Sequence, residues 1–328
     1  MTSVIKFNKT GYDPFIDFIK AYAIICVLIG HTLPVTNLGY GLWAGMQVPL
    51  FILVQTFHFY KKEKTSLNVK KIFQRVVLPF VVIGLFEFLV LCILYGGYGC
   101  KQMFYDELIN GGGYGPGSYF PVIYVQIAFL LPCFGWVLNR LNRTQLIWFF
   151  LALAEGLEVM CSLIQLPEWL YRLLAIRYLL LILLGWLWVR EGITLSRKMV
   201  ILSLMSALAI IYFEYVVEYY HIDNEPWFFK TAWTFHRWPC YYFCANGLVY
   251  YLQVIWRWSR KTEWINSFIK ELAKSSYEIF LVQMCACYAI SFLHMPGVMR
   301  ILIVWTISLV GGIAFSRINN IIFRIKAK

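Results

Sequence analysis

The sequence predicts an all-α protein, a polytopic integral membrane helix bundle with about ten transmembrane helices and both termini in the cytoplasm. Three observations predict this fold class. Of the 328 residues, 60% are hydrophobic and 14% are charged, whereas soluble domains are about 45–50% apolar and about 25% charged. The apolar residues form continuous runs that are long enough to cross a bilayer as helices. Lys and Arg gather in alternate connections between these runs, as they do in proteins that cross a membrane repeatedly.

The continuous runs argue against membrane strands, in which apolar and polar residues alternate. We expect a single domain over residues 1–328, with short cytoplasmic tails at 1–14 and 319–328. The ten expected spans, in chain order, cover residues 15–35, 42–60, 76–95, 119–138, 145–164, 169–189, 199–219, 239–256, 277–293 and 298–318.

Basic connections set the expected orientation. Lys and Arg are frequent in the tails and at 61–75, 140–143, 190–198 and 257–274, and these segments alternate with connections that hold few. The richer side is the cytoplasmic one under the positive-inside rule. The net charge of +12 therefore reflects membrane topology and does not predict a nucleic-acid partner. The nine cysteines contain no C-x-x-C pair, so we expect neither a metal site nor a disulfide framework.

The first span carries ionisable side chains at membrane depth, where they are costly and therefore indicate function. Lys20 and His31 are separated by three helical turns and about 20°, so they share one face about 16 Å apart. Asp17 can pair with Lys20 along the helix, and an imidazole suits proton transfer near neutral pH. Alternatively, His31 is a buried neutral histidine bonded to a neighbouring helix, and Asp17 and Lys20 form an interfacial pair. The shared face favours a functional site.

Lys71 and Arg75 belong to the basic connection at 61–75. Membrane topology and attraction to anionic lipid headgroups would be enough to explain its charge. The functional alternative is a docking surface for a cytosolic polyanion such as the nucleotide of coenzyme A. The sequence does not distinguish the two.

Other ionisable residues within the spans are weaker candidates. Arg177 could form a structural ion pair with one of the carboxylates. His236 and Arg237 open the eighth span, where an external polar substrate could bind. His58 and His294 lie near span ends, where we expect interfacial positions. The carboxylates are Glu87, Glu155, Glu158, Glu214, Glu218 and Glu278.

The segment from Tyr12 to His31 resembles the opening of the membrane-bound acyltransferase 3 family. The first helix of that family has a basic residue, ten further residues and a histidine, which Lys20 and His31 match. Residues 48–51 resemble its second helix, 71–79 the basic run before its third helix, and 272–282 its penultimate helix. The resemblance therefore extends over most of the chain.

The sequence departs from the family pattern at three places. Gln55 and Thr56 stand where the family usually has Ser-Gly. Before the third helix the family commonly has two basic residues at R-x-x-R spacing, and here the first of them, Lys71, comes one residue early. Gln283 stands where the penultimate helix often has a histidine. The last departure leaves His31 as the principal catalytic candidate.

The resemblance implies an integral membrane O-acyltransferase of the bacterial cytoplasmic membrane. Such an enzyme has no tightly bound cofactor, takes acetyl from the co-substrate acetyl-CoA and places it on a hydroxyl of a carbohydrate or glycolipid of the cell envelope. His31 would act as general base or carry the acyl group, Lys20 would steady an oxyanion or a donor phosphate, and Asp17 would hold Lys20. Lys71 and Arg75 would meet the donor phosphates. For the acceptor or its pocket we name Glu87, Arg177, His236, Arg237 and Gln283.

A multi-span transporter or exporter of a glycan or lipid-linked sugar is the alternative, because ten helices, a histidine and buried carboxylates would also suit a transport path. Transporters often show similarity between their two halves, and we see no convincing half-repeat. The acyl group (acetyl, succinyl or another), the acceptor and the membrane face on which it is modified stay open at this point. So does the choice between direct transfer and an acyl-enzyme.

Overall fold

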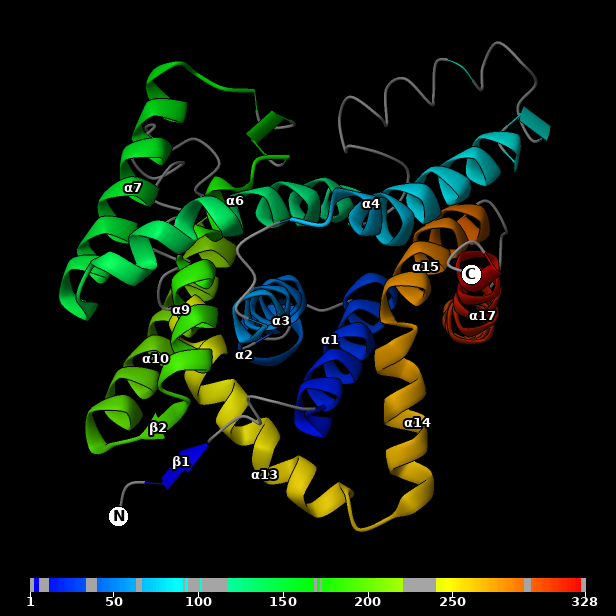
Figure 1. Ribbon diagram of the computed structural model, residues 1–328. Coiled ribbons are helices and arrows are strands. Elements are labelled where there is room, and N and C mark those ends of the chain that lie inside the picture. Colours follow the sequence, from blue (N-terminus) through cyan, green and yellow to red (C-terminus); the bar gives the residue numbers. More distant parts are fainter. Residues whose placement is uncertain are drawn as a thin grey trace.

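The computed structural model describes residues 3–5, 12–33, 40–62, 67–90, 92–93, 101, 117–167, 170–171, 173–220, 240–291 and 296–325. These segments form helices and one short β ribbon (Figure 1). The helices of the first half are α1 (Pro14–Thr32), α2 (Tyr40–Trp43), α3 (Gln47–Lys61), α4 (Val69–Ile72), α6 (Phe120–Arg140) and α7 (Arg143–Leu163). Those of the second half are α9 (Leu179–Arg190), α10 (Arg197–Tyr220), α13 (Val249–Ser259), α14 (Glu263–Lys274), α15 (Ser276–Ser291), α16 (Gly297–Thr306) and α17 (Gly312–Ile325).

Five helices within these segments are long and apolar enough to cross a membrane, and the apolar helix Ser276–Ile290 is shorter. The prediction of a helical, multi-pass membrane protein is thus confirmed, whereas ten spans and cytoplasmic termini stay predictions. The five helices are Pro14–Thr32, Val69–Val90, Phe120–Arg140, Arg143–Leu163 and Gly297–Ile322.

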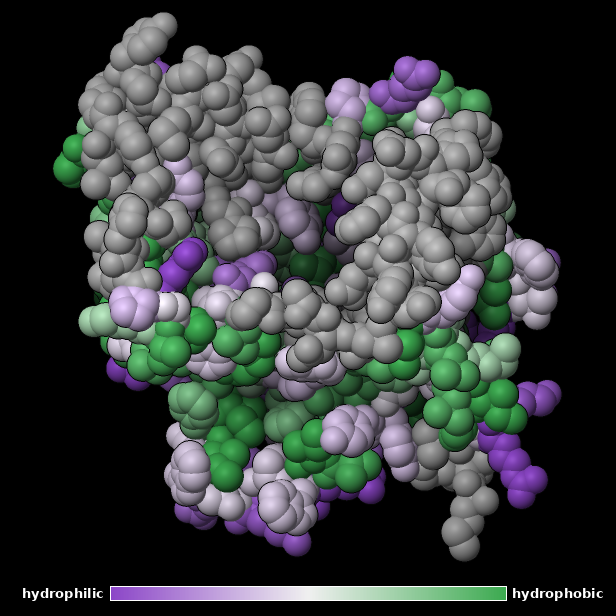
Figure 2. Space-filling view, turned by 180° about the vertical axis from the view of Figure 1, so that it is seen from behind, coloured by the Kyte–Doolittle hydropathy of each residue, from purple (hydrophilic) through white to green (hydrophobic). Residues whose placement is uncertain are grey.

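The outer surface is rich in apolar side chains. Trp148, Leu163 and Val310 are each about two-thirds exposed. Figure 2 shows hydrophobic side chains over much of the coloured part of one face. An apolar surface of this extent is unusual for a soluble protein and fits contact with lipid.

Several of the expected spans contain irregular helical segments. The span expected at 42–60 consists of α2, a 3-10 turn η1 (Ala44–Met46) and α3. The span at 169–189 includes a second 3-10 turn, η3 (Ala175–Tyr178), before α9, and the span at 239–256 includes a π-helical segment, η5 (Phe243–Leu248), before α13. Irregular backbone at membrane depth is tolerated where neighbouring protein buries it.

A short ribbon joins two segments far apart in the sequence. Strands β1 (Ser3–Ile5) and β2 (Ile193–Leu195) pair antiparallel, with Val4 opposite Thr194. The all-α prediction missed this ribbon because each strand has three residues, too few for a periodic pattern to show. Both strands lie in segments that we expect in the cytoplasm, and their pairing is compatible with that expectation.

Helix α3 packs between α1 and α9 at the centre of the bundle (Figure 1). A Cβ on Gly185 of α9 would lie 2.7 Å from the Cβ of Thr56, so only glycine permits this close approach of α3 and α9. The Gln55 amide donates a hydrogen bond to the carbonyl of Tyr124 in α6 at 2.8 Å. The two residues that depart from the family pattern in the second helix therefore hold α3 against its neighbours.

Candidate functional site

The start of α1 fixes Asp17 and Lys20. The Asp13 side chain caps the helix by accepting from the Phe15 amide at 3.0 Å, and Pro14 occupies the first turn, where its missing N–H costs nothing. Asp17 lies one turn after this cap, and the Lys20 ammonium lies 2.7 Å from one of its carboxylate oxygens. The pair expected from the sequence is therefore formed.

Asp17 has a second partner, because the Tyr12 hydroxyl donates to its other oxygen at 2.5 Å. Partial burial and the hydrogen bond to Asp17 raise the pKa of Tyr12 above its usual range, so the phenol stays a donor. Both oxygens of the Asp17 carboxylate are thus engaged. This holds the carboxylate, and with it Lys20, in one place.

Lys20 and Arg75, which we expect from the sequence to meet the donor, both line a cavity of about 470 Å³, and we call it the donor cavity after that expectation. Lys274 of α14 also lines it, with His58 of α3 and Glu278 of α15. Lys20 is paired with Asp17, which leaves Arg75 and Lys274 as two permanent cations opposite Glu278. The donor cavity therefore favours an anionic occupant. The remaining lining residues are Phe51, Val54, Gln55, Gln74, Val76, Pro79, Phe120, Tyr124, Ala273, Ser276, Tyr277, Phe280, Ser316, Asn319 and Asn320.

Not every expected donor residue reaches this place. Lys71 is exposed on α4 and is not among the residues that line the donor cavity. Lys274 was not predicted, although it lies within the segment 272–282 that resembles the family's penultimate helix. His58, expected at the interface, also lies on the cavity wall.

His31 lies at the other end of α1, in its last turn. A Cβ on Gly117 would be 3.5 Å from Cε1 of His31 and 3.0 Å from the ring of Phe280. Because Phe280 also lines the donor cavity, its ring lies between the cavity and the backbone beside His31. Phe120 packs against Phe280 with ring centroids 5.5 Å apart, and Phe51 against Phe120 at 5.7 Å. We call Phe51, Phe120 and Phe280 the aromatic wall.

Gln283 of α15 lies near the His31 imidazole. Its side chain is fully buried, and its amide nitrogen lies 3.1 Å from the sulfur of Cys287. Among the described residues, the Nδ1 atom of His31 and the Oε1 atom of Gln283 are buried without a hydrogen-bond partner. The Gln283 side chain therefore lies beside the ring, and Nδ1 of the imidazole stays available for a hydrogen bond.

Arg177 lies among tyrosine rings. Its Nη2 donates to the Tyr178 hydroxyl at 2.8 Å. The ring centroids of Tyr119, Tyr171 and Tyr178 lie 5.6, 5.7 and 5.1 Å from its guanidinium carbon. None of the carboxylates whose side chains the structure describes forms an ion pair with it; the side chains of Glu214 and Glu218 lie outside the described part. Glu158 instead accepts from the Tyr171 hydroxyl at 2.6 Å.

The remaining candidates are dispersed or lie elsewhere. Glu87 is buried near Cys285 of α15, and its Oε1 atom has no partner among the described residues. It does not line the donor cavity. His236 and Arg237 lie outside the described residues.

Comparisons with known proteins place this arrangement in a family. The family model described as an acyltransferase domain, acyltransferase 3, matches residues 13–318. Neither the curated proteins nor the solved structures give a significant match. The family match covers the helix with Asp17, Lys20 and His31, the aromatic wall and all residues of the donor cavity except Asn319 and Asn320. The chain belongs to the acyltransferase 3 family.

Proposed function

We propose that this membrane acyltransferase transfers an acetyl group from acetyl-CoA to a hydroxyl of a cell-envelope carbohydrate, from a position in the bacterial cytoplasmic membrane. The family match supports acyl transfer, and the apolar helices support a multi-pass membrane protein.

One observation carries the proposal: Phe280 borders both the cationic donor cavity and the Gly117 backbone beside His31. Lys20 and Arg75 bind the donor phosphates as charge-assisted hydrogen-bond donors. The pantetheine arm of coenzyme A is long and thin and ends in the thioester. A donor held by its phosphates in the cavity can therefore present its acyl group past the aromatic wall toward His31.

The separation of Lys20 and His31 along α1 gives the two residues different roles. The two lie about 16 Å apart along the helix, so Lys20 cannot also reach the oxyanion of a carbonyl that reacts beside His31. Of the two roles expected for Lys20, we retain phosphate binding. Asp17 and Tyr12 act on the donor only through Lys20.

His31 is the proposed general base. It takes the proton of the acceptor hydroxyl while the hydroxyl oxygen attacks the thioester carbonyl carbon. The carbon–sulfur bond then breaks, the acetyl ester remains on the acceptor, and the coenzyme A thiolate takes up the proton from His31. Gln283 is a positioning residue that holds the ring in orientation.

We place the acceptor near Arg177 and its tyrosines. Tyr119 contacts Arg177 and lies two residues after Gly117, which lies against His31. Aromatic faces pack against the apolar faces of sugar rings, and a guanidinium donates to their hydroxyl or carboxylate oxygens. The short turn at 117–119 thus links the proposed catalytic base to a surface suited to carbohydrate.

The test uses purified protein in nanodiscs with acetyl-CoA and measures release of free coenzyme A. The wild type is compared with His31→Ala and with His31→Gln, which keeps a polar side chain of similar size. We expect release by the wild type alone, with all three proteins eluting as the same folded species. If the folded wild type neither binds nor turns over acetyl-CoA, the proposal fails, and a transport path along Lys20 and His31 becomes the better account.

A further inference from the structure

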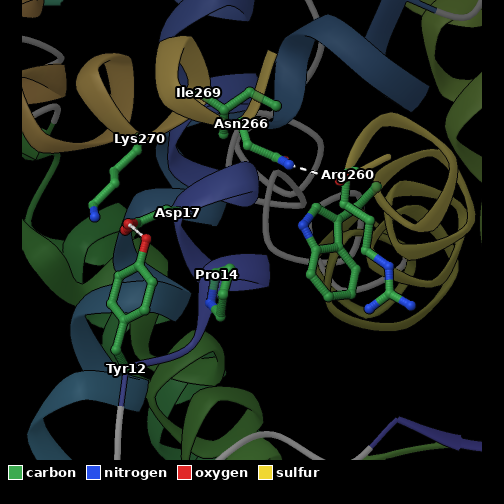
Figure 3. Close-up of a pocket in the computed structure, with 8 residues that line it drawn as sticks. Tyr12, Pro14, Asp17, Arg260, Asn266, Ile269 and Lys270 are labelled. Atoms are coloured by element: carbon green, nitrogen blue, oxygen red, sulfur yellow. Dashed lines mark hydrogen bonds between the residues drawn. The ribbon is translucent and has the colours of Figure 1, made fainter. Parts of the chain in front are cut away.

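A second cavity, of about 540 Å³, lies beside the start of α1 (Figure 3). It shares no lining residue with the donor cavity. Asp17 lines the second cavity and its ion-pair partner Lys20 lines the donor cavity, so this pair separates the two. The lining residues are Tyr12, Pro14, Asp17, Trp256, Arg260, Asn266, Ile269 and Lys270.

The walls of this cavity combine apolar surface with two cations. Trp256, Pro14 and Ile269 supply rings and aliphatic carbon. The Arg260 guanidinium lies 5.2 Å from the centroid of the Trp256 ring. In Figure 3, Arg260 and Lys270 flank Pro14 from opposite sides.

Both cations lie against aromatic rings: Arg260 against Trp256, and the Lys270 ammonium 5.5 Å from the centroid of the Tyr12 ring. Within the described part of the chain, no carboxylate forms an ion pair with Arg260 or Lys270. The one carboxylate in the lining, Asp17, already has Lys20 and the Tyr12 hydroxyl as partners. The charge left for an occupant is therefore positive.

Helix α14 indicates the depth of the cavity in the membrane. It packs against α1 on one side, and on its outer side Trp264 is 72% and Phe268 49% exposed. Trp258, at the end of α13, is 79% exposed. Exposed tryptophans are typical of the membrane–water interface, and a helix of twelve residues is too short to cross a bilayer. Helix α14 therefore suits a position along the membrane surface, with the cavity at the level of the lipid headgroups.

We infer that this cavity binds one anionic phospholipid. The negative headgroup faces the positive charge that Arg260 and Lys270 give to the cavity, and the glycerol and the first part of an acyl chain pack on Trp256 and Ile269. At headgroup depth the lipid phosphate is the most abundant anion, and the apolar wall fits an acyl chain better than it fits a water-soluble nucleotide. This inference is independent of the proposed acetyl transfer, because it concerns a separate cavity.

The test is native mass spectrometry of the purified full chain in mixed micelles that contain phosphatidylglycerol or, as reference, phosphatidylcholine with the same acyl chains. We compare the wild type with the double variant Arg260→Gln/Lys270→Gln. The control is Arg197→Gln/Lys198→Gln, which removes two exposed cations at the start of α10. We expect the cavity variant to lose about thirtyfold in affinity for phosphatidylglycerol. This is roughly the affinity that two basic residues contribute to binding at an anionic membrane surface. The control should retain the affinity of the wild type.

A second variant tests the apolar half of the cavity. Ile269→Trp should fill it and reduce phosphatidylglycerol retention while leaving both cations in place. Thermal unfolding in detergent shows whether each variant is folded. Equal retention of the two lipids by the wild type, or equal retention of phosphatidylglycerol by wild type and cavity variant, would overturn the inference. Displacement of the lipid by coenzyme A would do the same, because the cavity would then take a nucleotide.

Discussion

The backbone of Gly117 lies directly against the imidazole of His31, so that a Cβ at this position would be 3.5 Å from Cε1 of the ring. The same Cβ would lie 3.0 Å from Phe280, and Gly117 has a φ of +88°. Glycine is therefore required here both for its conformation and for its size. This contact joins the aromatic wall to the proposed catalytic base.

Replacing Gly117 by alanine should reduce acetyl transfer strongly while leaving donor binding intact. The left-handed backbone is strained for alanine by about 1 kcal/mol or more, and the new methyl group, 3.0 Å from Phe280, displaces that ring. Coenzyme A release and acetyl-CoA affinity measure the two effects. Gly84→Ala is the control, because nothing lies within 4 Å of a Cβ there and the site is helical. Equal activity of Gly117→Ala and Gly84→Ala would contradict the contact.

Arg75 and Lys71 provide a matched pair of basic residues on the same helix. Arg75 lines the donor cavity and Lys71 does not. Arg75→Gln should weaken acetyl-CoA binding about tenfold, the loss of one charge-assisted interaction with a phosphate, and Lys71→Gln should change it little. The difference should shrink at high salt, since salt screens exposed charges. Equal effects of the two variants would show that the phosphates bind elsewhere.

The Asp17 and Lys20 pair should behave as one unit in donor binding. Asp17→Asn releases the ammonium of Lys20, so the KM for acetyl-CoA should rise while kcat changes little. Lys20→Gln should have the larger effect on KM. In the double variant the effects should not add, because each substitution already disrupts the same pair. Additive effects would mean that Asp17 acts independently of Lys20.

Gln283 is expected to position His31. Gln283→Ala should lower kcat about tenfold through loss of orientation, with the KM for acetyl-CoA unchanged. Gln283→His should restore much of the activity, because a histidine there can also hydrogen-bond the His31 ring. If Gln283→Ala changes KM and leaves kcat alone, the residue binds substrate instead.

The packing of the bundle can be tested apart from the chemistry. Gly185→Ala places a methyl group 2.7 Å from Thr56 and should destabilise the protein by about 1–3 kcal/mol, as overpacking does. Thermal unfolding in detergent measures this. The compensating pair Gly185→Ala/Thr56→Ala should recover part of the loss. If Gly185→Ala leaves the stability of the protein unchanged, α3 and α9 do not approach so closely.

The sequence predicted the features that depend on local spacing. The membrane helices follow from long apolar runs, and the Asp17 and Lys20 pair follows from helical spacing within α1. The breaks at η1, η3 and η5 were not predicted, because tertiary packing and not composition permits them. The short ribbon between Val4 and Thr194 was missed because it depends on pairing across the whole chain.

The candidate site could not be predicted from residue spacing within one helix alone. Lys274, Phe280 and Gly117 come from separate elements, and only the fold brings them to the donor cavity and to His31. For Arg177 we considered a carboxylate partner, whereas its neighbours are tyrosine rings from several segments. One-dimensional patterns do not encode such ring contacts.

The central claim is that phosphate binding and proton transfer occupy opposite ends of α1. The most direct measurement compares His31→Ala with Arg75→Gln, with acetyl-CoA affinity by titration and coenzyme A release at saturating donor. We predict that His31→Ala binds acetyl-CoA as the wild type does but releases no coenzyme A, and that Arg75→Gln binds weakly but turns over when saturated. Loss of binding in His31→Ala together with normal binding in Arg75→Gln would contradict the account.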